Sequence, residues 1–476
     1  MDLAHAHVVV AGLGVSGRAA LDVLTGRGAR VVTVDARAED ADARDAADFV
    51  AGGGLDGVDL VVASPGWAPT NPLLTAALAL GVPVWSEVEL AWQVRVDRTG
   101  GRGPAPWLAV TGTNGKTTTV GMLESILRAG GENARAVGNV GTPVVLAATD
   151  PDLDVLAVEL SSFQLHFTHS MAAEAAAVLN IAPDHLDWHG SLDAYTADKA
   201  RIFERVEVAC VYNAADPMTE RLVRDADVQD GAVAIGFTLA MPRVGQVGLV
   251  EDVLVDRGFA ELRHTHAVEL ATCADLAHLG GPDGEVAPHV RADALAAAAL
   301  ALAHGVAPLA IRDGLRSYAP GAHRLQTVAR SGDVTWVDDS KATNGHAAAA
   351  ALAAFGPGSV VWIAGGLAKG ATFDDLVVSR RDRLRAVVLI GADQTQLRDA
   401  LDRHAPEVPL VVVDPGDTGT VMTRAVEQAR LLATAAPGPV TVLLAPACAS
   451  MDQFVSYAER GESFAAAARA LASSVG

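Results

Sequence analysis

The 476-residue chain has few cysteines and no long apolar run. Its three cysteines, Cys210, Cys273 and Cys448, lie far apart without CxxC spacing, which argues against a disulfide framework or zinc knuckle and favours a reducing compartment. The longest apolar run, 294–303, is too short to cross a bilayer. Because the N-terminus also lacks the basic region and long apolar core of a signal peptide, we expect a cytoplasmic protein without membrane insertion.

Basic charge is also scarce, since 36 basic residues face 57 acidic ones and the net charge is −21. This balance argues against a nucleic-acid partner, and an anionic ligand would have to be met by local cations, metal ions or backbone N–H groups. Only four of the basic residues are lysines: Lys116, Lys199, Lys341 and Lys369. The count alone is compatible with a simple preference for arginine.

The remaining composition, 50% apolar and 20% charged, is that of a globular protein. At roughly 150 residues per domain, the length indicates about three domains. Short apolar runs alternate with helical stretches, which predicts an α/β fold with buried parallel strands. The Gly/Pro-rich segment 97–106 and the Pro/Gly segment 318–321 suggest boundaries that define three domains, 1–99, 100–319 and 320–476.

The apolar runs that we interpret as strands recur in all three regions. Short strands and turns are expected near 230–285, and an Ala/Leu-rich helix at 293–304. The other expected strands are 7–11, 30–34, 58–63, 107–110, 155–159, 175–180, 206–212, 335–337, 360–364, 387–390, 410–413 and 441–444.

A glycine-rich turn, GLGVSG at 12–17, follows the first expected strand, and Asp35 ends the next one. This arrangement is typical of dinucleotide binding, because glycines let the backbone approach a pyrophosphate and the acid can hold a ribose. NAD or another nucleotide diphosphate would fit it, and so would a tight turn without a ligand. The segment 64–66 after the third strand is either a second turn at the same crevice or an ordinary loop.

A second phosphate-type loop, GTNGKT at 112–117, follows the strand at 107–110 and precedes a helix. It is shorter than the GxxxxGK[ST] pattern, but it has the same parts. Backbone N–H groups would cradle phosphates, Lys116 would reach the outer phosphates, and a hydroxyl would reach Mg²⁺. Two such loops in separate domains argue against a plain dehydrogenase.

Polar residues follow the next strands of the middle region. Glu159 ends an apolar strand, His185 lies in the segment 184–187, and Lys199 lies in a helical stretch. Glu159 and His185 would suit Mg²⁺ beside the phosphate loop, although Mg²⁺ prefers oxygen ligands. The plain alternatives are an edge-of-sheet carboxylate at Glu159, a helix cap at Asp184 and a surface lysine at Lys199.

The last region carries four further motifs, three of which follow expected strands. They are AHR at 322–324, DDSKATN at 338–344, GGLAKG at 365–370 and PACASMDQF at 446–454. Each could be a simple turn. Together they predict a rim of hydroxyls, two lysines and an acid that suits a small anionic substrate, because α/β sheets bind ligands at the carboxyl ends of their strands.

The motifs, taken in order along essentially the whole chain, resemble those of the Mur ligases. The resemblance is strongest to the members that add D-glutamate, through GLGVSG with Asp35, SPG, DDSKATN and PACASMDQF. It implies a Rossmann-like UDP-binding domain, a central P-loop ATPase domain and a C-terminal Rossmann-like α/β domain that binds the amino acid. It also implies an ATP-dependent ligase that adds D-glutamate to UDP-N-acetylmuramoyl-L-alanine through an acyl phosphate, in peptidoglycan precursor synthesis.

The resemblance also assigns roles in ATP chemistry. The catalytic residues would be Lys116, Glu159, His185 and Lys199. Mg²⁺ would be held by Thr117, Glu159, His185 and Lys199, the last as a carbamate, which turns a cation into an oxygen ligand. ATP would be bound by Gly112, Thr113, Asn114, Gly115, Lys116, Thr117, Thr118, Asp293, Arg324 and Asp339.

Two further sets of residues would bind the substrates. The UDP-substrate would be bound by Gly14, Val15, Asp35, Arg37, Ser64, Gly66 and Asn139. D-glutamate would be bound by His185, Lys341, Thr343, Lys369, Ser450 and Tyr457. All four lysines fall within these motifs, at positions where the planar guanidinium of arginine is a poor substitute. We expect a monomer that acts on these small molecules.

The sequence departs from the family pattern at 289–293, where Asp293 replaces the second asparagine of an HNxxN segment. An acid there would repel phosphate unless it turned to the base or paired with Arg291. Ala36 lacks a hydroxyl, and Leu367 replaces an acid that some relatives carry. The alternatives are a relative that uses L-glutamate or another UDP-sugar, an NAD-dependent oxidoreductase, and a non-catalytic binding protein.

Overall fold

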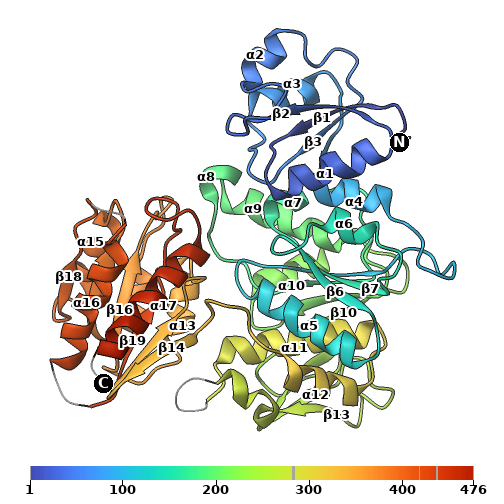
Figure 1. Cartoon of the computed structure of the whole chain (residues 1–476). Helices are drawn as coiled ribbons and strands as arrows, with labels where there is room; N and C mark the ends of the chain where they lie inside the picture. The colour runs from blue at the N-terminus through green and yellow to red at the C-terminus, as the bar shows by residue number, and fades with distance from the viewer. Residues whose placement is uncertain (1, 281–284, 417–418, 436–437, 475–476) are drawn as a thin grey trace. The chain divides into compact units, whose positions relative to one another are not determined.

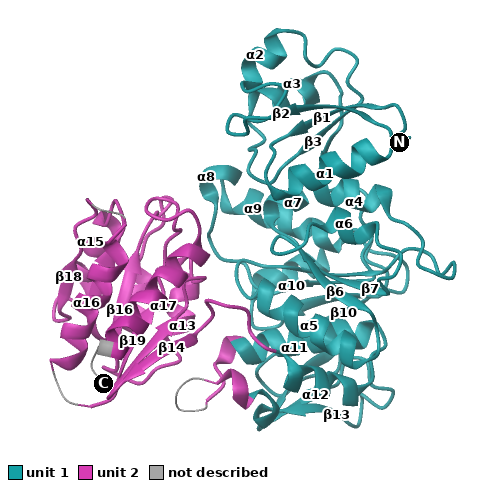
Figure 2. Cartoon of the chain, viewed as in Figure 1, with its two compact units in different colours: residues 1–276, 290–318 teal, residues 277–289, 319–476 magenta. Residues whose placement is uncertain are grey.

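The chain folds into two compact units (Figure 2). Unit 1 comprises residues 1–276 and 290–318, and unit 2 comprises residues 277–289 and 319–476. The computed structural model describes residues 2–280, 285–416, 419–435 and 438–474. None of the helices in this described part of the chain combines the length and apolar character needed to span a bilayer.

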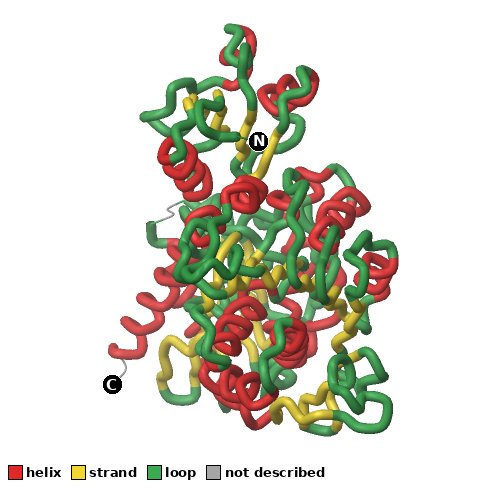
Figure 3. The backbone as a smooth tube through the Cα atoms, turned by 90° about the vertical axis from the view of Figure 1, so that its right-hand side faces the viewer, coloured by secondary structure: helices red, strands yellow, loops and turns green. Residues whose placement is uncertain are grey.

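Unit 1 begins with a four-stranded parallel sheet in the order β2-β1-β3-β4. Its strands are β1 (His7–Ala11), β2 (Arg30–Val34), β3 (Leu60–Ala63) and β4 (Val84–Ser86). Its helices are α1 (Val15–Gly26), α2 (Ala46–Ala51), α3 (Pro72–Ala79) and α4 (Glu87–Val94). Figure 3 shows these strands in yellow between red helices at the top of the view. Because both faces are covered, the central strands are continuous apolar runs.

The second sheet of unit 1 has nine strands, in the order β13-β12-β11-β10-β9-β8-β5-β7-β6 (Figure 1). The strands from β6 to β11 pair with their neighbours in parallel. Strand β12 pairs antiparallel with β11, and β13 pairs antiparallel with β12. The strands are β5 (Trp107–Thr111), β6 (Ala134–Gly138), β7 (Val155–Glu159), β8 (Ala175–Val178), β9 (Ala209–Asn213), β10 (Val233–Phe237), β11 (Gln246–Val250), β12 (Val253–Asp256) and β13 (Val268–Thr272).

Helices cover this central sheet. They are α5 (Lys116–Ala129), α6 (Val144–Ala148), α7 (Ser162–His166), α8 (Leu186–His189), α9 (Leu192–Ala200), α10 (Pro217–Arg224), α11 (Pro288–Ala303) and α12 (Pro308–Ser317). Helices α5 and α12 pack closely, because Gly314 has no side chain and lies directly against the backbone of Ile126. Pro288 begins α11, a position where a missing N–H costs no helical hydrogen bond.

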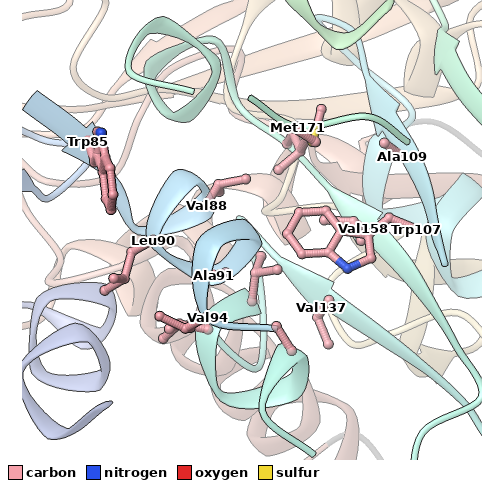
Figure 4. Packing of buried hydrophobic residues seen from close by; sticks show 14 of the residues in the cluster. Trp85, Val88, Leu90, Ala91, Val94, Trp107, Ala109, Val137, Val158 and Met171 are labelled. Carbon is pink, nitrogen blue, oxygen red and sulfur yellow. The ribbon is translucent and has the colours of Figure 1, made fainter. Parts of the chain in front are cut away.

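One continuous core joins the two sheets of unit 1 (Figure 4). Val88 and Ala91 of α4 share a buried cluster with Trp107 of β5. At the same junction Glu87 Oε1 accepts a 2.6 Å hydrogen bond from the Val145 backbone N–H at the start of α6. Burial raises the pKa of Glu87 to about 7, although this N–H opposes the change. The junction is therefore mainly apolar, and the Glu87 carboxyl is buried where the ends of two helices meet.

Unit 2 contains a six-stranded sheet in the order β14-β15-β19-β16-β17-β18. The strands are β14 (Gln326–Ser331), β15 (Val334–Asp338), β16 (Val360–Gly365), β17 (Leu384–Ile390), β18 (Leu410–Val412) and β19 (Val440–Leu444). Only β14 is antiparallel. The helices are α13 (Gly345–Leu352), α14 (Asp374–Arg380), α15 (Thr395–His404), α16 (Val421–Thr434) and α17 (Tyr457–Ser474). Apolar clusters around Trp362 and Trp336 fill the two faces.

The expected α/β class is confirmed, with differences at element ends. The strand expected at 206–212 begins only at Ala209, because Val206 closes the turn that follows a short 3-10 helix. Three strands were not expected: β4, β6 and β14. β14 escapes the apolar-run criterion because it is an edge strand, QTVARS, with none of its residues buried.

Candidate active site

The glycine-rich turn after β1 is organised by Asp35 at the end of β2. Gly12 adopts a φ of 92°, which only glycine tolerates easily. One Asp35 oxygen accepts a 2.6 Å hydrogen bond from Leu13 N, and the other accepts one of 2.7 Å from Arg37 N. Partial burial acts to raise the pKa of Asp35, but these N–H groups hold it below its ordinary value. Ser64 Oγ donates to Gly12 O at 2.9 Å. The turn, Asp35 and Ser64 therefore meet at one edge of the sheet.

The phosphate-type loop after β5 ends at the N-terminus of α5, where backbone N–H groups favour an anion. Gly112 and Gly115 have φ values of 154° and 87°. A Cβ at Gly115 would collide with Asp293, so Asp293 lies directly against the loop. Lys116 Nζ donates to Gly112 O at 2.9 Å and to Thr113 O at 3.0 Å, and it thus folds over the loop.

The amine of Lys199 lies under the same loop. Lys199 is only 2% exposed, so it is not the surface lysine that the sequence alone allowed. Its Nζ donates to Gly112 O at 2.9 Å and to Thr111 Oγ1 at 3.2 Å, so Lys116 and Lys199 share one carbonyl oxygen. Burial, followed by the charge of Lys116, lowers the pKa of Lys199 well below its ordinary value. The amine therefore loses its proton more easily than an exposed lysine.

Glu159 ends β7, the neighbour of β5, and is 3% exposed. Asn139 holds it twice: Asn139 Nδ2 donates to Glu159 Oε1, and Asn139 N donates to Glu159 O, both at 2.9 Å. His185 follows β8, the other neighbour of β5. It occupies the N-cap position of α8 with a left-handed φ of 53°, and Asp184 instead accepts from the His185 backbone N–H. Strands β7, β5 and β8 are neighbours in the sheet, so their carboxyl ends lie at one edge. Glu159, the phosphate-type loop and the loop that carries His185 lie at these three ends.

The described residues include no group of three or more His, Cys, Asp or Glu side chains that is placed to hold a metal ion. Glu159 and Thr117 offer oxygen atoms, which Mg²⁺ prefers. The Lys199 amine donates hydrogen bonds in its unmodified form and cannot ligate a cation through the same protons. The residues present therefore fit Mg²⁺ only together with oxygen atoms from a phosphate ligand or from a modified lysine.

In unit 2, the loop after β15 carries Asp339 and Lys341. Leu325 N donates to Asp339 Oδ1 at 3.2 Å, and burial raises the pKa of Asp339 to about 7 against the opposing effect of this N–H and of Arg324. Lys341 Nζ lies 3.9 Å from the centroid of the Tyr457 ring, a favourable cation–π contact. Lys341 and Tyr457, which are far apart in the sequence, therefore meet here.

The loops after β16 and β19 are joined to each other. Leu367 N donates to Ala449 O at 2.9 Å, and Ala449 N donates to Leu367 O at 3.0 Å. This bridge holds the segment with Lys369 beside the segment with Ser450. Ala447 N also donates to Ala342 O at 2.9 Å, next to Thr343. Because β15, β19 and β16 are consecutive in the sheet, their carboxyl ends form the rim that the sequence predicts.

Arg460 was not predicted from the sequence, and it links two loops of this rim through buried hydrogen bonds. Arg460 is 1% exposed, and it donates to Ser340 Oγ and Ser340 O at 3.0 Å and to Cys448 O at 3.1 Å. His323 was noted without a role, and its Nδ1 lies 2.6 Å from Asp338 Oδ2. The short AERGESF segment around Arg460 carries no recognisable ligand pattern, so only the folded chain reveals this contact.

Comparison with known families places this α/β architecture with its phosphate-type loop among the Mur ligases. Three family models match: a MurD-like N-terminal domain at 6–86, a Mur ligase middle domain at 110–242, and a Mur ligase glutamate ligase domain at 323–448. The chain belongs to the Mur ligase family, as its motifs predict.

Several curated relatives that match along nearly the whole chain are named UDP-N-acetylmuramoylalanine--D-glutamate ligase. The relative from Streptomyces coelicolor is 57% identical, with 98% of each chain covered. The relative from Thermobifida fusca is 52% identical, with 99% of this chain and 100% of the other covered. The relative from Bifidobacterium longum subsp. infantis is 48% identical, with 98% of each chain covered.

Solved structures share the fold at low sequence identity. The UDP-N-acetylmuramate-alanine ligase MurC from Thermotoga maritima has a TM-score of 0.57 and 16% identity, with 98% of this chain and 100% of that chain covered. MurF from Acinetobacter baumannii has a TM-score of 0.56 and 19% identity, with 92% of this chain and 90% of that chain covered. These likenesses support the three-sheet α/β architecture.

Proposed function

We propose that the chain is an ATP-dependent ligase that adds D-glutamate to UDP-N-acetylmuramoyl-L-alanine in peptidoglycan precursor synthesis. The observation that carries this proposal is the identity of 57% over 98% of both chains with a relative of that name. The phosphate-type loop, with two lysine amines on one carbonyl oxygen, supports it chemically.

The reaction proceeds in two steps in this proposal. A carboxylate oxygen of the alanyl group attacks the γ-phosphorus of ATP, and the bond to ADP breaks. The D-glutamate amine then attacks the carbonyl carbon of the acyl phosphate and loses a proton. Inorganic phosphate leaves and keeps the carboxylate oxygen that attacked phosphorus in the first step. A carboxylate is a poor electrophile, so phosphorylation supplies the leaving group, and catalysis depends on orientation and on charge stabilisation.

In the ATP site of this proposal, the residues of the 112–118 loop bind phosphates through backbone N–H groups, and Lys116 neutralises charge on the transferred phosphoryl group. Asp293 is proposed to belong to the ATP site, because it lies directly against Gly115 at the N-terminal end of α5. Arg324 and Asp339 are proposed to contact the nucleotide.

Mg²⁺ is proposed to be held by Thr117, Glu159, His185 and a carbamylated Lys199, where it would neutralise phosphate charge. The low pKa of Lys199 supports the modification, because only an unprotonated amine adds to CO₂. That addition forms an N–C bond and releases one proton, and it leaves a carboxylate-like oxygen pair in place of a cation. Asn139 would keep Glu159 oriented toward this site.

The UDP-substrate is proposed to lie at the turn organised by Asp35, where Gly14, Val15, Arg37, Ser64 and Gly66 surround the carboxyl ends of β1 to β3. Because the Asp35 oxygens already accept backbone N–H groups, its contribution includes shaping the turn. D-glutamate carboxylates are proposed to bind the rim of unit 2, at Lys341, Thr343, Lys369, Ser450 and Tyr457, together with His185.

We further propose three domains, 1–99, 100–319 and 320–476, and a cytoplasmic monomer. The three separate sheets support the division into domains. The absence of CxxC spacing in the sequence supports a reducing compartment.

The direct test is a phosphate-release assay with ATP, Mg²⁺, UDP-N-acetylmuramoyl-L-alanine and either enantiomer of glutamate. We expect stoichiometric ADP, phosphate and UDP-N-acetylmuramoyl-L-alanyl-D-glutamate only when all substrates and the D enantiomer are present. Equal turnover with L-glutamate would refute the stereospecific claim. Oxidation of NADH without use of ATP would refute the assignment to this reaction.

A further inference from the structure

Four polar side chains of unit 1 form a continuous hydrogen-bonded chain, here called the Asp198 network: the buried Ser162, His189 and Asp198, and the partly exposed His166. The Nδ1 atoms of both imidazoles lie 2.9 Å from Asp198 carboxylate oxygens. The Nε2 atom of His189 lies 2.9 Å from Ser162 Oγ. Because a carboxylate only accepts, both Nδ1 atoms donate to Asp198, which leaves His189 Nε2 to pair with the Ser162 hydroxyl.

The hydrogen bonds run from Ser162 to His189 to Asp198, as in a hydrolytic triad. The burial of Ser162, however, argues against a role as a nucleophile. Ser162 is 2% exposed, and the His189 side chain is fully buried. The Phe163 ring stacks on His189 at 5.5 Å, and the Tyr195 ring meets it edge-on at 5.2 Å. A substrate carbonyl therefore has no access to Ser162 Oγ, and the network acts within the protein.

The position of the network in the fold shows what it can act on. Ser162 begins α7, three residues after Glu159 at the end of β7, and His189 ends α8, which begins after His185. Asp198 lies on α9 and directly precedes Lys199. The network therefore joins three short helices, each adjacent in sequence to a residue of the proposed metal side of the site.

We propose that the Asp198 network is a positioning device for the ligase reaction proposed above. It fixes the positions of α7, α8 and α9 relative to one another. This keeps the Lys199 amine beside Gly112 O, and His185 at the same edge of the central sheet. Short helices have little stability of their own, so tertiary contacts must set their positions. A displacement of about 1 Å at such a site costs up to about 100-fold in rate. The proposal rests on the proposed function.

The test compares Asp198→Asn with Asp193→Asn, the same change at an exposed position of the same helix. In Asp198→Asn the new amide N–H₂ faces an imidazole N–H, so one ring must change tautomer or move. Ser162→Ala is the milder variant, because it removes only the hydroxyl. The readouts are the Mg²⁺ concentration at half-maximal ligation, the kcat and KM values, the melting temperature, and the ¹H NMR signals of the imidazole N–H groups.

For Asp198→Asn we expect about 10- to 100-fold lower kcat together with a several-fold higher half-saturating Mg²⁺ concentration, and a nearly unchanged KM for UDP-N-acetylmuramoyl-L-alanine. One downfield imidazole N–H signal that is present in the wild type is lost. Ser162→Ala shifts half-saturating Mg²⁺ in the same direction by a smaller factor. A double variant with Asp198→Asn adds little to the single one, because the groups act as a unit.

A purely structural role predicts a lower melting temperature and less active enzyme, but an unchanged half-saturating Mg²⁺ concentration, because that concentration does not depend on the active fraction. That result, or Asp198→Asn equal to Asp193→Asn in all readouts, overturns the positioning role. If Asp198→Asn does not fold, an unchanged Mg²⁺ response in folded Ser162→Ala overturns it. A wild-type enzyme that forms no product with D-glutamate refutes the proposed function instead.

Discussion

Replacing Lys199 with alanine should abolish most ligation, with a loss of at least about 100-fold in kcat, and short-chain carboxylates should restore part of it. The loss follows because the truncation removes the amine on which the proposed carbamate forms, and with it the pair of oxygen atoms offered to Mg²⁺. The restoration follows because the truncation leaves space, and a carboxylate such as acetate presents the same pair of oxygen atoms. The measurement is phosphate release by folded Lys199→Ala across a series of carboxylate concentrations.

Two controls make the Lys199 result specific. Chloride at equal ionic strength should restore nothing, because it supplies charge without a bidentate oxygen pair. The Asp193→Asn variant, altered at an exposed position of the same helix, should remain within a small factor of the wild type. A folded Lys199→Ala enzyme that no carboxylate restores would leave the carbamate role unsupported.

Replacing Lys116 with alanine should lower kcat by about 10²- to 10³-fold, because the ammonium group neutralises charge on the transferred phosphoryl oxygens. Arginine should not replace it, since the site needs a compact charge that folds over the loop onto Gly112 O and Thr113 O. Calorimetry should show nearly unchanged binding of UDP-N-acetylmuramoyl-L-alanine, which is proposed to bind at the N-terminal turn.

Added carboxylates separate the two lysines. They should not restore Lys116→Ala, because the missing group there is a cation. The loss of the Lys116 charge also removes one cause that lowers the pKa of Lys199, so Lys199 should hold its proton to higher pH in this variant. Activity of Lys116→Ala within a few-fold of the wild type would contradict the proposed role in phosphoryl transfer.

Much of the fold was predictable because parallel strands buried on both faces are apolar runs and glycine-rich turns follow them. The runs at 7–11, 107–111 and 440–444 lie where the sequence predicts strands, to within a residue at either end. The rarity of lysine also helped to predict the site residues. Arginine takes the place of lysine over most of this sequence, so the four remaining lysines indicate positions where more than a positive charge is needed. Two of the four lysines meet on the carbonyl of Gly112.

The contacts that support the site were not predictable, because they depend on the order of strands and on helix register. Arg460 bonds both Ser340 after β15 and Cys448 after β19, two strands whose pairing the sequence does not reveal. Asp198, His189 and Ser162 meet only when three short helices pack together. None of these residues stands out by composition, since a buried and a solvated aspartate look alike in a sequence.

The central claim is that ATP activates the alanyl carboxylate as an acyl phosphate. It is tested most directly with UDP-N-acetylmuramoyl-L-alanine that carries ¹⁸O in both carboxylate oxygens, turned over with ATP and D-glutamate. In the proposed reaction the attacking oxygen stays on phosphorus when the amine displaces phosphate. We expect one ¹⁸O atom in each released phosphate and one in the amide carbonyl of the product. Released phosphate without ¹⁸O, at full product formation, would contradict it.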